Sequence, residues 1–401
     1  MPPSPTLSVV RVGPGTTDPS THQLVRSSAN VLYVIAPDGQ NYPGDPSAHL
    51  RARKGDLPGT PTSFALQDDT HAPGSGVISS GIAIDGQDRI HCAWLDSSGA
   101  VKYAVFNTVT NLWESVTTLA ASGLSGIGQG FEGIALALDA ANNPHVVWSQ
   151  YVGSVGQRLR YANRINGTWS AAVQVEDIAN RDTWHPAIAF SPNGDSTIAW
   201  LDGDGSAYGN TGVLRTRVRR TNGTWDASQA IDDLPLMNLD NGPSLMIGTD
   251  GVRHITFTSF ANNVWGAMRY WSDAGAGWKG DQQRVSISSH DPALGPDGNG
   301  GLYIYAHGPV NGSSLNTAIG LGHGKWSMHK PAGATTWESF TEIIAENSSL
   351  IPAGTGIDDA TNTRWAQFTH SFPKTLDFTF WTYSPDPANG YTIYIGTRTV
   401  P

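Results

Sequence analysis

The sequence has little cysteine and little charge. Its 401 residues include a single cysteine, Cys92, which excludes an intrachain disulfide and, in an apolar strand pattern, favours a buried, inert thiol. Only 14% of the residues are charged, and the formal net charge is −10. Because this field repels polyanions, we expect no nucleic-acid partner, and an anionic ligand would need a locally basic pocket.

Long apolar runs are also missing. None reaches the roughly 18 residues that a membrane-spanning helix needs. The opening MPPSPTLSVVRVGPG shows no basic segment followed by an apolar one, so we expect no signal peptide and no membrane insertion. The compartment stays open, and an extracellular or virion-associated location is compatible with the sequence.

Glycine, proline and tryptophan are abundant instead, with 46, 25 and 14 copies, which is typical of short strands joined by turns. One pattern recurs: a short strand, a turn rich in Asp, Asn or Gly, and a second strand that ends in an aromatic residue. It is found in SSGIAIDGQDRIHCAWLD, FEGIALALDAANNPHVVWSQ, HPAIAFSPNGDSTIAWLD, GPSLMIGTDGVRHITFTSF and DPALGPDGNGGLYIYAHG, with looser copies HQLVRSSANVLYVIAPDG and RWAQFTHSFPKTLDFTFWTY near the ends. Seven copies in 401 residues give a period of about 57, the size of a propeller blade.

A third strand follows each copy, and a turn then leads through a tryptophan into a fourth strand. Four antiparallel strands repeated seven times predict an all-β chain that folds as a single seven-bladed β-propeller. The last copy lacks a fourth strand, so we expect the N-terminal PTLSVVRV to complete it and to close the ring. The expected blades span residues 20–70, 78–120, 131–176, 185–232, 242–286, 291–344, and 364–401 together with 5–13.

Three series of residues recur at fixed positions of the repeat. The turn tryptophans Trp113, Trp169, Trp225, Trp278 and Trp337 are expected to pack between blades, and two of them end the tetrapeptide NGTW, whose Asn and Gly suit a hairpin turn. At the start of the second strand we interpret the histidines as structural rather than as metal ligands or bases. Basic residues near the start of the third strand are expected to join neighbouring blades, with an arginine triad for an anion as the alternative. These two series are His91, His145 and His254, and Arg51, Lys102, Arg160, Arg215 and Arg269.

The I-A-x-D first strands, H-V-V-W second strands and Gly-x-Trp turns resemble the bacterial-neuraminidase-repeat, or sialidase-like, superfamily over nearly the whole chain. This resemblance implies a β-propeller. Only WSDAGAGW comes near the Asp-box of that superfamily, and the Phe-Arg-Ile-Pro motif of sialidases is absent, so sialidase activity is not implied. Non-catalytic sugar-binding propellers and polysaccharide lyases also belong to the superfamily, so the resemblance implies fold more than function.

Residues found in one copy only, in loops between second and third strands or between blades, are the site candidates, because these loops share one face of a propeller. NRDTWHP is the richest stretch: an aromatic plane, a charged fork and an imidazole suit the hydroxyls and apolar faces of a sugar. Its structural alternative makes Trp184 a packing residue and Arg181–Asp182 a local salt bridge. The ligand-binding candidates are His71, Glu132, Arg181, Asp182, Trp184, His185, Asp240, Asn241, His290, Asp291, His307, Arg364 and Trp365.

Three functional hypotheses follow, and we favour the first. It is a carbohydrate-recognising adhesin or receptor-binding module, with a glycan surface as partner, in a virion or an extracellular assembly. The second is a polysaccharide-cleaving enzyme: a lyase in which His71 or His185 acts as base, Tyr151 as acid and Arg181 as neutraliser of a uronate, or else a glycoside hydrolase. The third is a scaffold that binds only protein.

Two further segments bear on cofactors and assembly. LDGDGSAYGN, with Asp202 and Asp204, contains alternating acids of the kind that bind Ca²⁺, but turn composition explains it better, so we expect no metal or other cofactor. GHGKWSMHKPAGATTW is interpreted as a long insertion in the sixth blade that either caps a cleft or makes a protein contact, as is the connection AENSSLIPAGTGIDDATNTRW.

Overall fold

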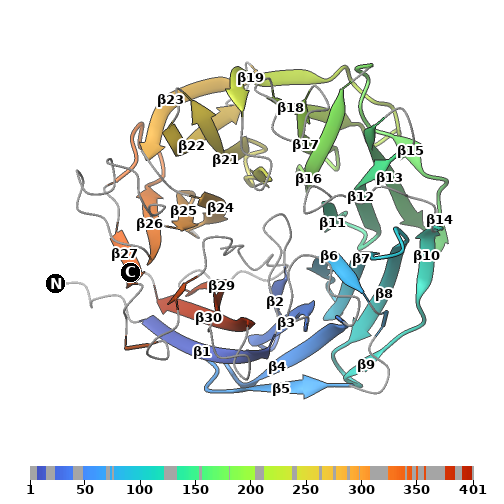
Figure 1. The fold of residues 1–401 in the computed structure, drawn as a ribbon, viewed down its shortest axis with the longest axis vertical. Coiled ribbons are helices and arrows are strands. Elements are labelled where there is room, and N and C mark those ends of the chain that lie inside the picture. Colours follow the sequence, from blue (N-terminus) through green and yellow to red (C-terminus); the bar gives the residue numbers. More distant parts are fainter. Residues whose placement is uncertain are drawn as a thin grey trace.

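Strands and turns make up a ring of β-sheets, an all-β propeller, in the computed structural model (Figure 1). Among the described residues, no helix has the length and hydrophobicity needed to span a membrane. The structure describes residues 7–14, 23–38, 48–68, 73–74, 76–121, 133–152, 156–179, 181–203, 212–236, 242–261, 264–273, 277–286, 290–297, 299–307, 324–338, 341–345, 349–350, 356–357, 375–383 and 391–399.

Six sheets follow one another in chain order, and each is named here by its first and last strands. The β2–β5 sheet contains β2 (Leu24–Arg26), β3 (Val31–Pro37), β4 (Leu50–Pro58) and β5 (Phe64–Gln67). The β6–β10 sheet contains β6 (Val77–Ile84), β7 (Arg89–Asp96), β8 (Val101–Asn107), β9 (Leu112–Trp113) and β10 (Thr117–Ala120). The β11–β15 sheet contains β11 (Ile134–Leu138), β12 (Pro144–Tyr151), β13 (Gln157–Ile165), β14 (Thr168–Trp169) and β15 (Val173–Gln174).

The next three sheets repeat this order. The β16–β19 sheet contains β16 (Asp182–Phe190), β17 (Ser196–Gly203), β18 (Gly212–Arg219) and β19 (Gln229–Leu236). The β20–β23 sheet contains β20 (Ser244–Ile247), β21 (Arg253–Ala261), β22 (Val264–Asp273) and β23 (Lys279–Ser286). The β24–β27 sheet contains β24 (His290–Pro296), β25 (Leu302–His307), β26 (Gly324–Lys330) and β27 (Thr341–Ala345).

A further sheet combines both ends of the chain. Its strands, in spatial order, are β1 (Leu7–Pro14), β30 (Tyr391–Thr399), β29 (Thr375–Tyr383) and β28 (Gly356–Ile357). β1 runs antiparallel to β30, with Leu7 opposite Arg398, and Figure 1 shows the two strands side by side. This pairing confirms the prediction that the N-terminal strand completes the last sheet.

Two details differ from the sequence interpretation. In the β6–β10 and β11–β15 sheets the outer position is divided between two short strands, so these sheets have five strands rather than four. The proposed sixth-blade insertion is wrong over residues 324–330, because these residues form β26, the regular third strand of its sheet. The apolar alternation in β26 is limited to Trp326 and Met328, with Gly324, Lys325 and Lys330 around them, so the sequence pattern did not indicate a strand there.

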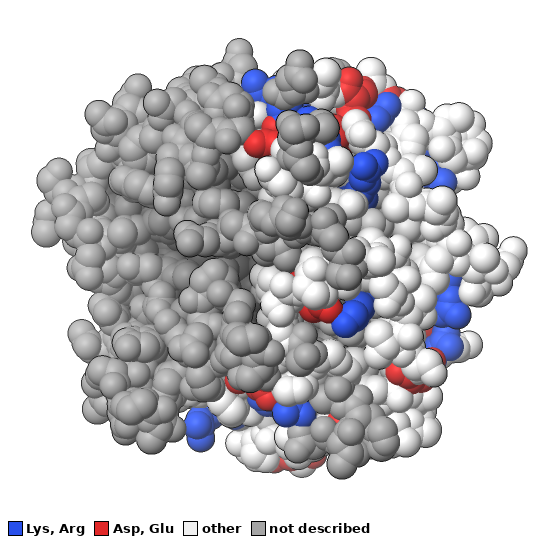
Figure 2. All heavy atoms as spheres, turned by 45° about the vertical axis from the view of Figure 1, so that its right-hand side comes forward, with Lys and Arg blue, Asp and Glu red and all other residues white. Residues whose placement is uncertain are grey.

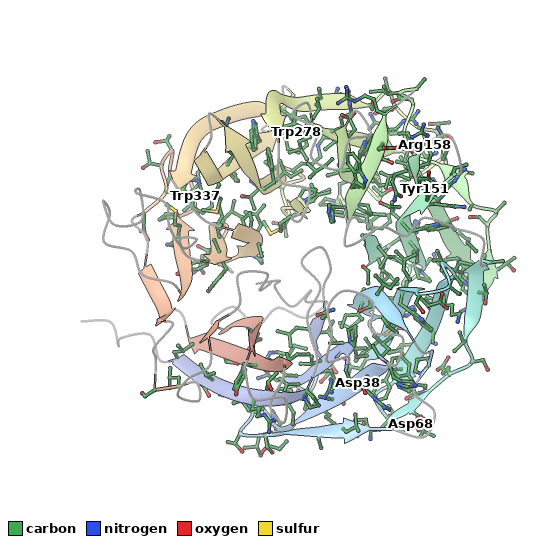
Figure 3. The ribbon with its side chains drawn as sticks, in the orientation of Figure 1. Asp38, Asp68, Tyr151, Arg158, Trp278 and Trp337 are labelled. Carbon is green, nitrogen blue, oxygen red and sulfur yellow. The ribbon has the colours of Figure 1, made fainter. Side chains whose placement is uncertain are left out.

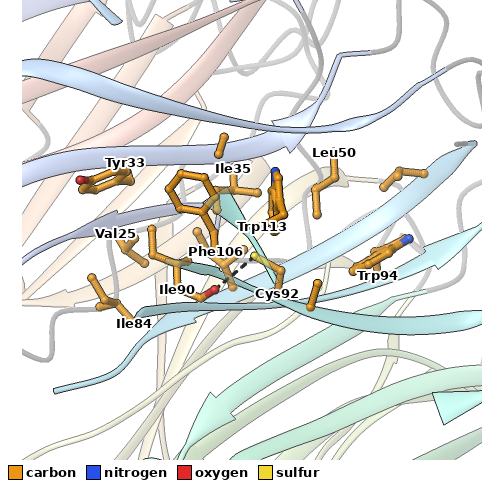
Figure 4. Close-up of a cluster of buried hydrophobic side chains, with 14 residues drawn as sticks. Val25, Tyr33, Ile35, Leu50, Ile84, Ile90, Cys92, Trp94, Phe106 and Trp113 are labelled. Atoms are coloured by element: carbon orange, nitrogen blue, oxygen red, sulfur yellow. Dashed lines mark hydrogen bonds between the residues drawn. The ribbon is translucent and has the colours of Figure 1, made fainter. Parts of the chain in front are cut away.

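The core lies between neighbouring sheets. In Figure 4, Val25, Tyr33 and Leu50 of the β2–β5 sheet pack against Trp94 and Phe106 of the β6–β10 sheet. Cys92 is fully buried in this cluster, where burial raises the pKa of its thiol, so the prediction of a buried cysteine is confirmed. Burial of this kind is the main stabilising contribution in a chain whose one cysteine cannot form an intrachain disulfide.

The turn tryptophans pack between sheets, as predicted. The ring of Trp169 meets Tyr103 of the preceding sheet edge to face, with ring centroids 4.9 Å apart. Trp225 and Trp337 make the same contact with Tyr161 and Tyr270, at 5.5 and 5.1 Å. Trp278 instead donates its indole N–H to Thr216 Oγ1 at 3.0 Å. Such contacts both bury area and set the angle between adjacent sheets.

The recurrent histidines, two of them buried and His254 partly buried, form hydrogen bonds within their own sheets. His91, His145 and His254 each place Nδ1 within 2.5–2.7 Å of a tyrosine hydroxyl on the third strand of their own sheet. Nε2 of His145 lies 3.4 Å from Asp139, and the residue is 3% exposed. The structural interpretation of this series is therefore confirmed.

The environment of these histidines predicts that the fold loses stability in acid. Burial lowers the pKa of His145 from about 6.5 to about 4, despite the attraction of Asp139, and burial lowers that of His254 to the same value. Because a depressed histidine pKa favours the neutral form in the fold, its stabilising contribution is complete above pH 6.5 and is lost as the pH falls toward 4. For His145 this amounts to about 3 kcal/mol.

Urea unfolding of the wild type and of His145→Gln, at several pH values between 7.5 and 4.5, measures this contribution. The free energy of unfolding of the wild type should fall more steeply with decreasing pH than that of the variant. Parallel pH profiles would show that His145 does not titrate with the depressed pKa.

Three members of the basic series pair with acids of their own sheet rather than with a neighbouring blade. Arg51 lies 2.5 Å from Asp38 Oδ2 and Lys102 lies 2.6 Å from Asp96 Oδ2, and in both pairs the acid belongs to the same sheet. Arg215 pairs in the same way with Asp202. The prediction was wrong for these three residues, because the acid at the end of the second strand lies directly beside the start of the third.

Candidate functional site

The propeller has two ends with different loops. At the turn end lie the tight turns between first and second strands, such as residues 85–88 and 191–195, and the turns that carry the tryptophans. At the connection end lie the loops between second and third strands and the links between sheets. The sequence analysis predicted a site at the connection end. Of its ligand-binding candidates, Arg181, Asp182, Trp184 and His185 have described side chains, and they lie where the β11–β15 and β16–β19 sheets meet.

Arg181 and Arg215 share one buried carboxylate at this end. Arg181 Nε donates to Asp202 Oδ1 at 2.9 Å, and Arg215 Nε donates to Asp202 Oδ2. The side chain of Asp202 is 1% exposed, whereas that of Arg181 is 25% exposed. Arg181 thus reaches the surface while Asp202 holds it in a defined position. The alternative of an Arg181–Asp182 salt bridge is not the arrangement found.

Asp182 is held by the backbone of the neighbouring sheet. Its Oδ1 accepts the N–H of Gln157 at 2.6 Å, and Arg158 Nη1 lies 3.7 Å from the same oxygen. A Cβ on Gly156, where φ is +83°, would lie 1.9 Å from this oxygen, so only glycine allows the approach. The side chain of Asp182 keeps 17% of its surface exposed.

Arg158 connects the strand that carries Gln157 to the segment that carries Arg181. Its Nη1 donates to the carbonyl oxygens of Gln157 and Arg181, each at 2.6 Å, and its Nε lies 3.6 Å from Glu176. Burial raises the pKa of Glu176, whose side chain is 1% exposed and accepts the N–H of Leu159. Cross-strand pairing places Tyr151 opposite Gln157, and Figure 3 shows Tyr151 beside Arg158. We call Tyr151, Arg158, Arg181, Asp182 and Asp202 the strand-end cluster.

Trp184 and His185 are buried rather than displayed. Trp184 is 4% exposed. Its ring packs directly on Gly203: a Cβ atom at residue 203 would lie only 2.6 Å from Cζ3 of Trp184. His185 is 1% exposed and has φ +49° within an irregularity of register between Trp184 and Ala187. Trp184 is therefore a packing residue rather than a stacking surface for a sugar. The strained backbone conformation, with positive φ, is that of His185, the next residue.

For three other candidates the structure describes the strand but not the side chain. The register of β24 and β25 places His290 opposite His307, so these two candidates are cross-strand neighbours, with Asp291 next along β24. The side chains of these three residues lie outside the described part. Entirely outside the described residues are His71, Glu132, Asp240, Asn241, Arg364, Trp365 and Asp204.

No group of three or more His, Cys, Asp or Glu side chains in the described residues could hold a metal ion. Asp202, considered for Ca²⁺, directs both carboxylate oxygens at arginines instead. Two cations beside the carboxylate oppose a third one. In the described part of the chain, Asp202 therefore serves to hold Arg181 and Arg215.

Sequence reasoning missed Arg158, Gln157 and Glu176. Arg158 precedes Arg160, the member of the basic series, by two positions. The residues two positions before the other members of that series are not arginines: His49, Ala100, Val213 and Ala267. The sequence analysis searched only loops for residues that occur in a single repeat. The same search at strand ends would have found Arg158. Glu176 gave no signal, because its importance comes from burial beside Arg158.

A cavity of about 480 Å³ lies at the other end of the molecule. It is bounded by the turn of residues 191–195, by residues 217–229 and by residues 249–253, so it opens between the β16–β19 and β20–β23 sheets at the turn end. The sequence filter assigned this end to architecture. On the face that Figure 2 shows, basic and acidic side chains lie in small mixed groups among uncharged residues.

Comparisons with known proteins agree with this geometry at the level of fold. No protein-family model matches the sequence, and no curated protein matches it. Among solved structures, a lectin from Burkholderia pseudomallei matches with a TM-score of 0.64 and 13% identity, covering 95% of this chain and 98% of the lectin. An ulvan lyase bound to its oligosaccharide matches with a TM-score of 0.56 and 10% identity, over 96% and 94% of the two chains.

The chain shares its fold with a lectin and with a polysaccharide lyase. A Hadza microbial sialidase matches as well, with a TM-score of 0.49 and 10% identity over 87% of this chain and 73% of the sialidase, a likeness too low to carry an argument. The β-propeller fold that the sequence resemblance implied is confirmed by the lectin and the lyase, and at these identities the likeness concerns the fold alone.

Proposed function

We propose that this propeller recognises carbohydrate, and that the strand-end cluster is part of its binding surface. The observation that carries the proposal is the pair of partly exposed, rigidly held groups Arg181 and Asp182 at the end of the strands. The register places Tyr151 opposite Gln157, the residue whose backbone N–H binds Asp182. The guanidinium and the carboxylate offer hydrogen-bond donors and acceptors within one small area, and a tyrosine on the adjoining strand can add an apolar ring face. Sugars present matching hydroxyl pairs and C–H faces.

Preorganisation supports the same conclusion. Asp202 fixes Arg181, and the Gln157 N–H fixes Asp182, so little side-chain freedom is lost when a ligand binds. The lectin of matching fold is consistent with this proposal.

Recognition without cleavage fits the titratable groups better than catalysis does. A lyase base or a hydrolase acid must reach the substrate. His185 is 1% exposed, and Glu176, the carboxyl group here whose pKa is raised, is equally buried behind Arg158. The carboxylates of Asp182 and Asp202 already accept hydrogen bonds, from the Gln157 N–H and from Arg181, so neither is a free carboxyl group aimed at a substrate.

Two finer interpretations belong to the proposal. We infer that the ring counts seven blades, with the sheet of β28, β29, β30 and β1 as the seventh, because its strand order continues that of the six other sheets. The role as an adhesin or receptor-binding module within a virion or an extracellular assembly stays a prediction.

Arg181→Ala on a glycan array tests the site. The variant should lose about tenfold or more in glycan affinity, since a charged hydrogen-bond donor is removed. Its stability should change little, because Asp202 keeps Arg215. Arg89→Ala is the matched control: it removes a half-exposed arginine that pairs with Asp85 at the turn end. Equal binding by wild type, Arg181→Ala and Arg89→Ala would contradict the proposed site.

A further inference from the structure

The cavity at the turn end is built from two neighbouring sheets. The β16–β19 sheet contributes Thr197, Arg217, Arg220 and Gln229, and the β20–β23 sheet contributes Asp250 and Arg253. Its volume of about 480 Å³ falls within the roughly 300–1,000 Å³ that is usual for small-molecule sites. It lies at the end of the ring opposite to the strand-end cluster, so it is a separate site.

Ion-paired arginines form its walls. Arg220 donates through Nη1 to Asp195 Oδ2 at 2.9 Å and through Nε to Asp226 Oδ1 at 3.0 Å. Across the cavity, Arg253 Nε donates to Asp273 Oδ2 at 2.8 Å. Each pair offers donors and acceptors side by side in a fixed geometry.

Tryptophans from the turns hold these walls in place. The guanidinium of Arg217 lies 5.4 Å above the ring of Trp225, and that of Arg253 lies 5.0 Å above the ring of Trp278. Trp278, which Figure 3 shows where the two sheets meet, is itself tied to Thr216 across the junction. Stacking and hydrogen bonding together leave the guanidinium groups little freedom.

The charges of the lining nearly cancel, since it contains three arginines and four aspartates. An anion would meet the aspartates and a cation the arginines, and either would have to break existing pairs. A hydroxyl group can accept from a guanidinium and donate to a carboxylate at the same time. The lining therefore suits a neutral, polyhydroxylated molecule.

We propose that this cavity is a second carbohydrate site, specific for neutral mono- or disaccharide units. The inference rests on the proposed function and extends it to a second location. Binding at both ends of one propeller would let a single chain engage two glycan branches, which raises avidity where the geometry allows both contacts.

Blocking variants test the inference from both walls. Ala227 and Thr249 line the cavity on opposite sheets, and both are exposed. Ala227→Trp and Thr249→Trp fill the space and leave every ion pair intact, while Ala227→Ser and Thr249→Ser are the matched controls. Saturation-transfer NMR with D-mannose, L-fucose and D-galactose, and with D-glucuronate and D-glucosamine as charged probes, measures binding to each protein.

The wild type and both serine variants should bind at least one neutral sugar better than the charged probes. Both tryptophan variants should lose about tenfold or more in affinity for it. Undiminished binding by either folded tryptophan variant, or preference for a charged probe, overturns the inference. If Arg181→Ala loses glycan binding and the tryptophan variants do not, the proposed function stands and the second site fails. If the wild type binds neither neutral sugars nor the glycan array, both fail.

Discussion

Asp377→Ala is expected to lower the free energy of unfolding by about 3–5 kcal/mol, because it leaves the Arg26 guanidinium buried without its counter-ion. Arg26 donates through Nε and Nη2 to both oxygens of Asp377, at 2.7–2.9 Å, and both side chains are 0% exposed. The pair joins β2 to β29, and so connects the first complete sheet to the sheet that contains the two chain ends. Urea unfolding measures the change.

A double variant separates the ion pair from the packing. Arg26→Met with Asp377→Leu removes both charges, so it should be more stable than Asp377→Ala, although a methionine side chain cannot replace the bonds of Arg26 to Asn30 and Gly59. Burial raises the pKa of Asp377 while Arg26 opposes that rise, which fits a carboxylate that depends on its partner. A loss below about 1 kcal/mol in Asp377→Ala would show that water reaches Arg26 and that the junction is open.

Trp200→Ala should be similarly damaging, with an expected loss of about 3–5 kcal/mol. Trp200 is 0% exposed at the end of the second strand and packs with Val147, Leu159 and Tyr161 of the preceding sheet. Removing the indole leaves a cavity between two sheets that strand pairing holds in position.

Trp225→Ala is the matched comparison. Trp225 packs in the same interface, against Tyr161, but it is only partly buried. Water can fill the space that its indole leaves, so its loss should cost clearly less than that of Trp200. An equal or larger loss in Trp225→Ala would mean that the turns, rather than the second strands, carry the stability of the interface.

The fold was predictable from the sequence because its signals repeat. Most second strands carry an aromatic residue near their end, and Trp94, Trp148 and Trp200 all prove to be fully buried against the preceding sheet. The short N-terminal strand was predictable as well, because the last repeat had an empty outer position. Where the repeat weakens, as around β26, the same reasoning mistook a strand for an insertion.

The site was harder to predict because it depends on contacts between repeats. NRDTWHP named the right segment, but the sequence could not show that Arg181 turns to Asp202 rather than to Asp182, or that Trp184 packs inward on Gly203. The turn-end cavity escaped for a different reason. Its residues belong to regular turns of two different sheets, and only their packing creates the space between them.

The central claim is that the propeller binds glycans without cleaving them. A polysaccharide array run in parallel for bound protein and for products, by absorbance near 235 nm for unsaturated uronates and by reducing-end assay, tests it most directly. The proposed function predicts bound protein on at least one glycan and neither kind of product. Product formation on any glycan, in proportion to the amount of protein, would contradict the claim and make the chain an enzyme, and absence of both signals would leave a scaffold that binds only protein.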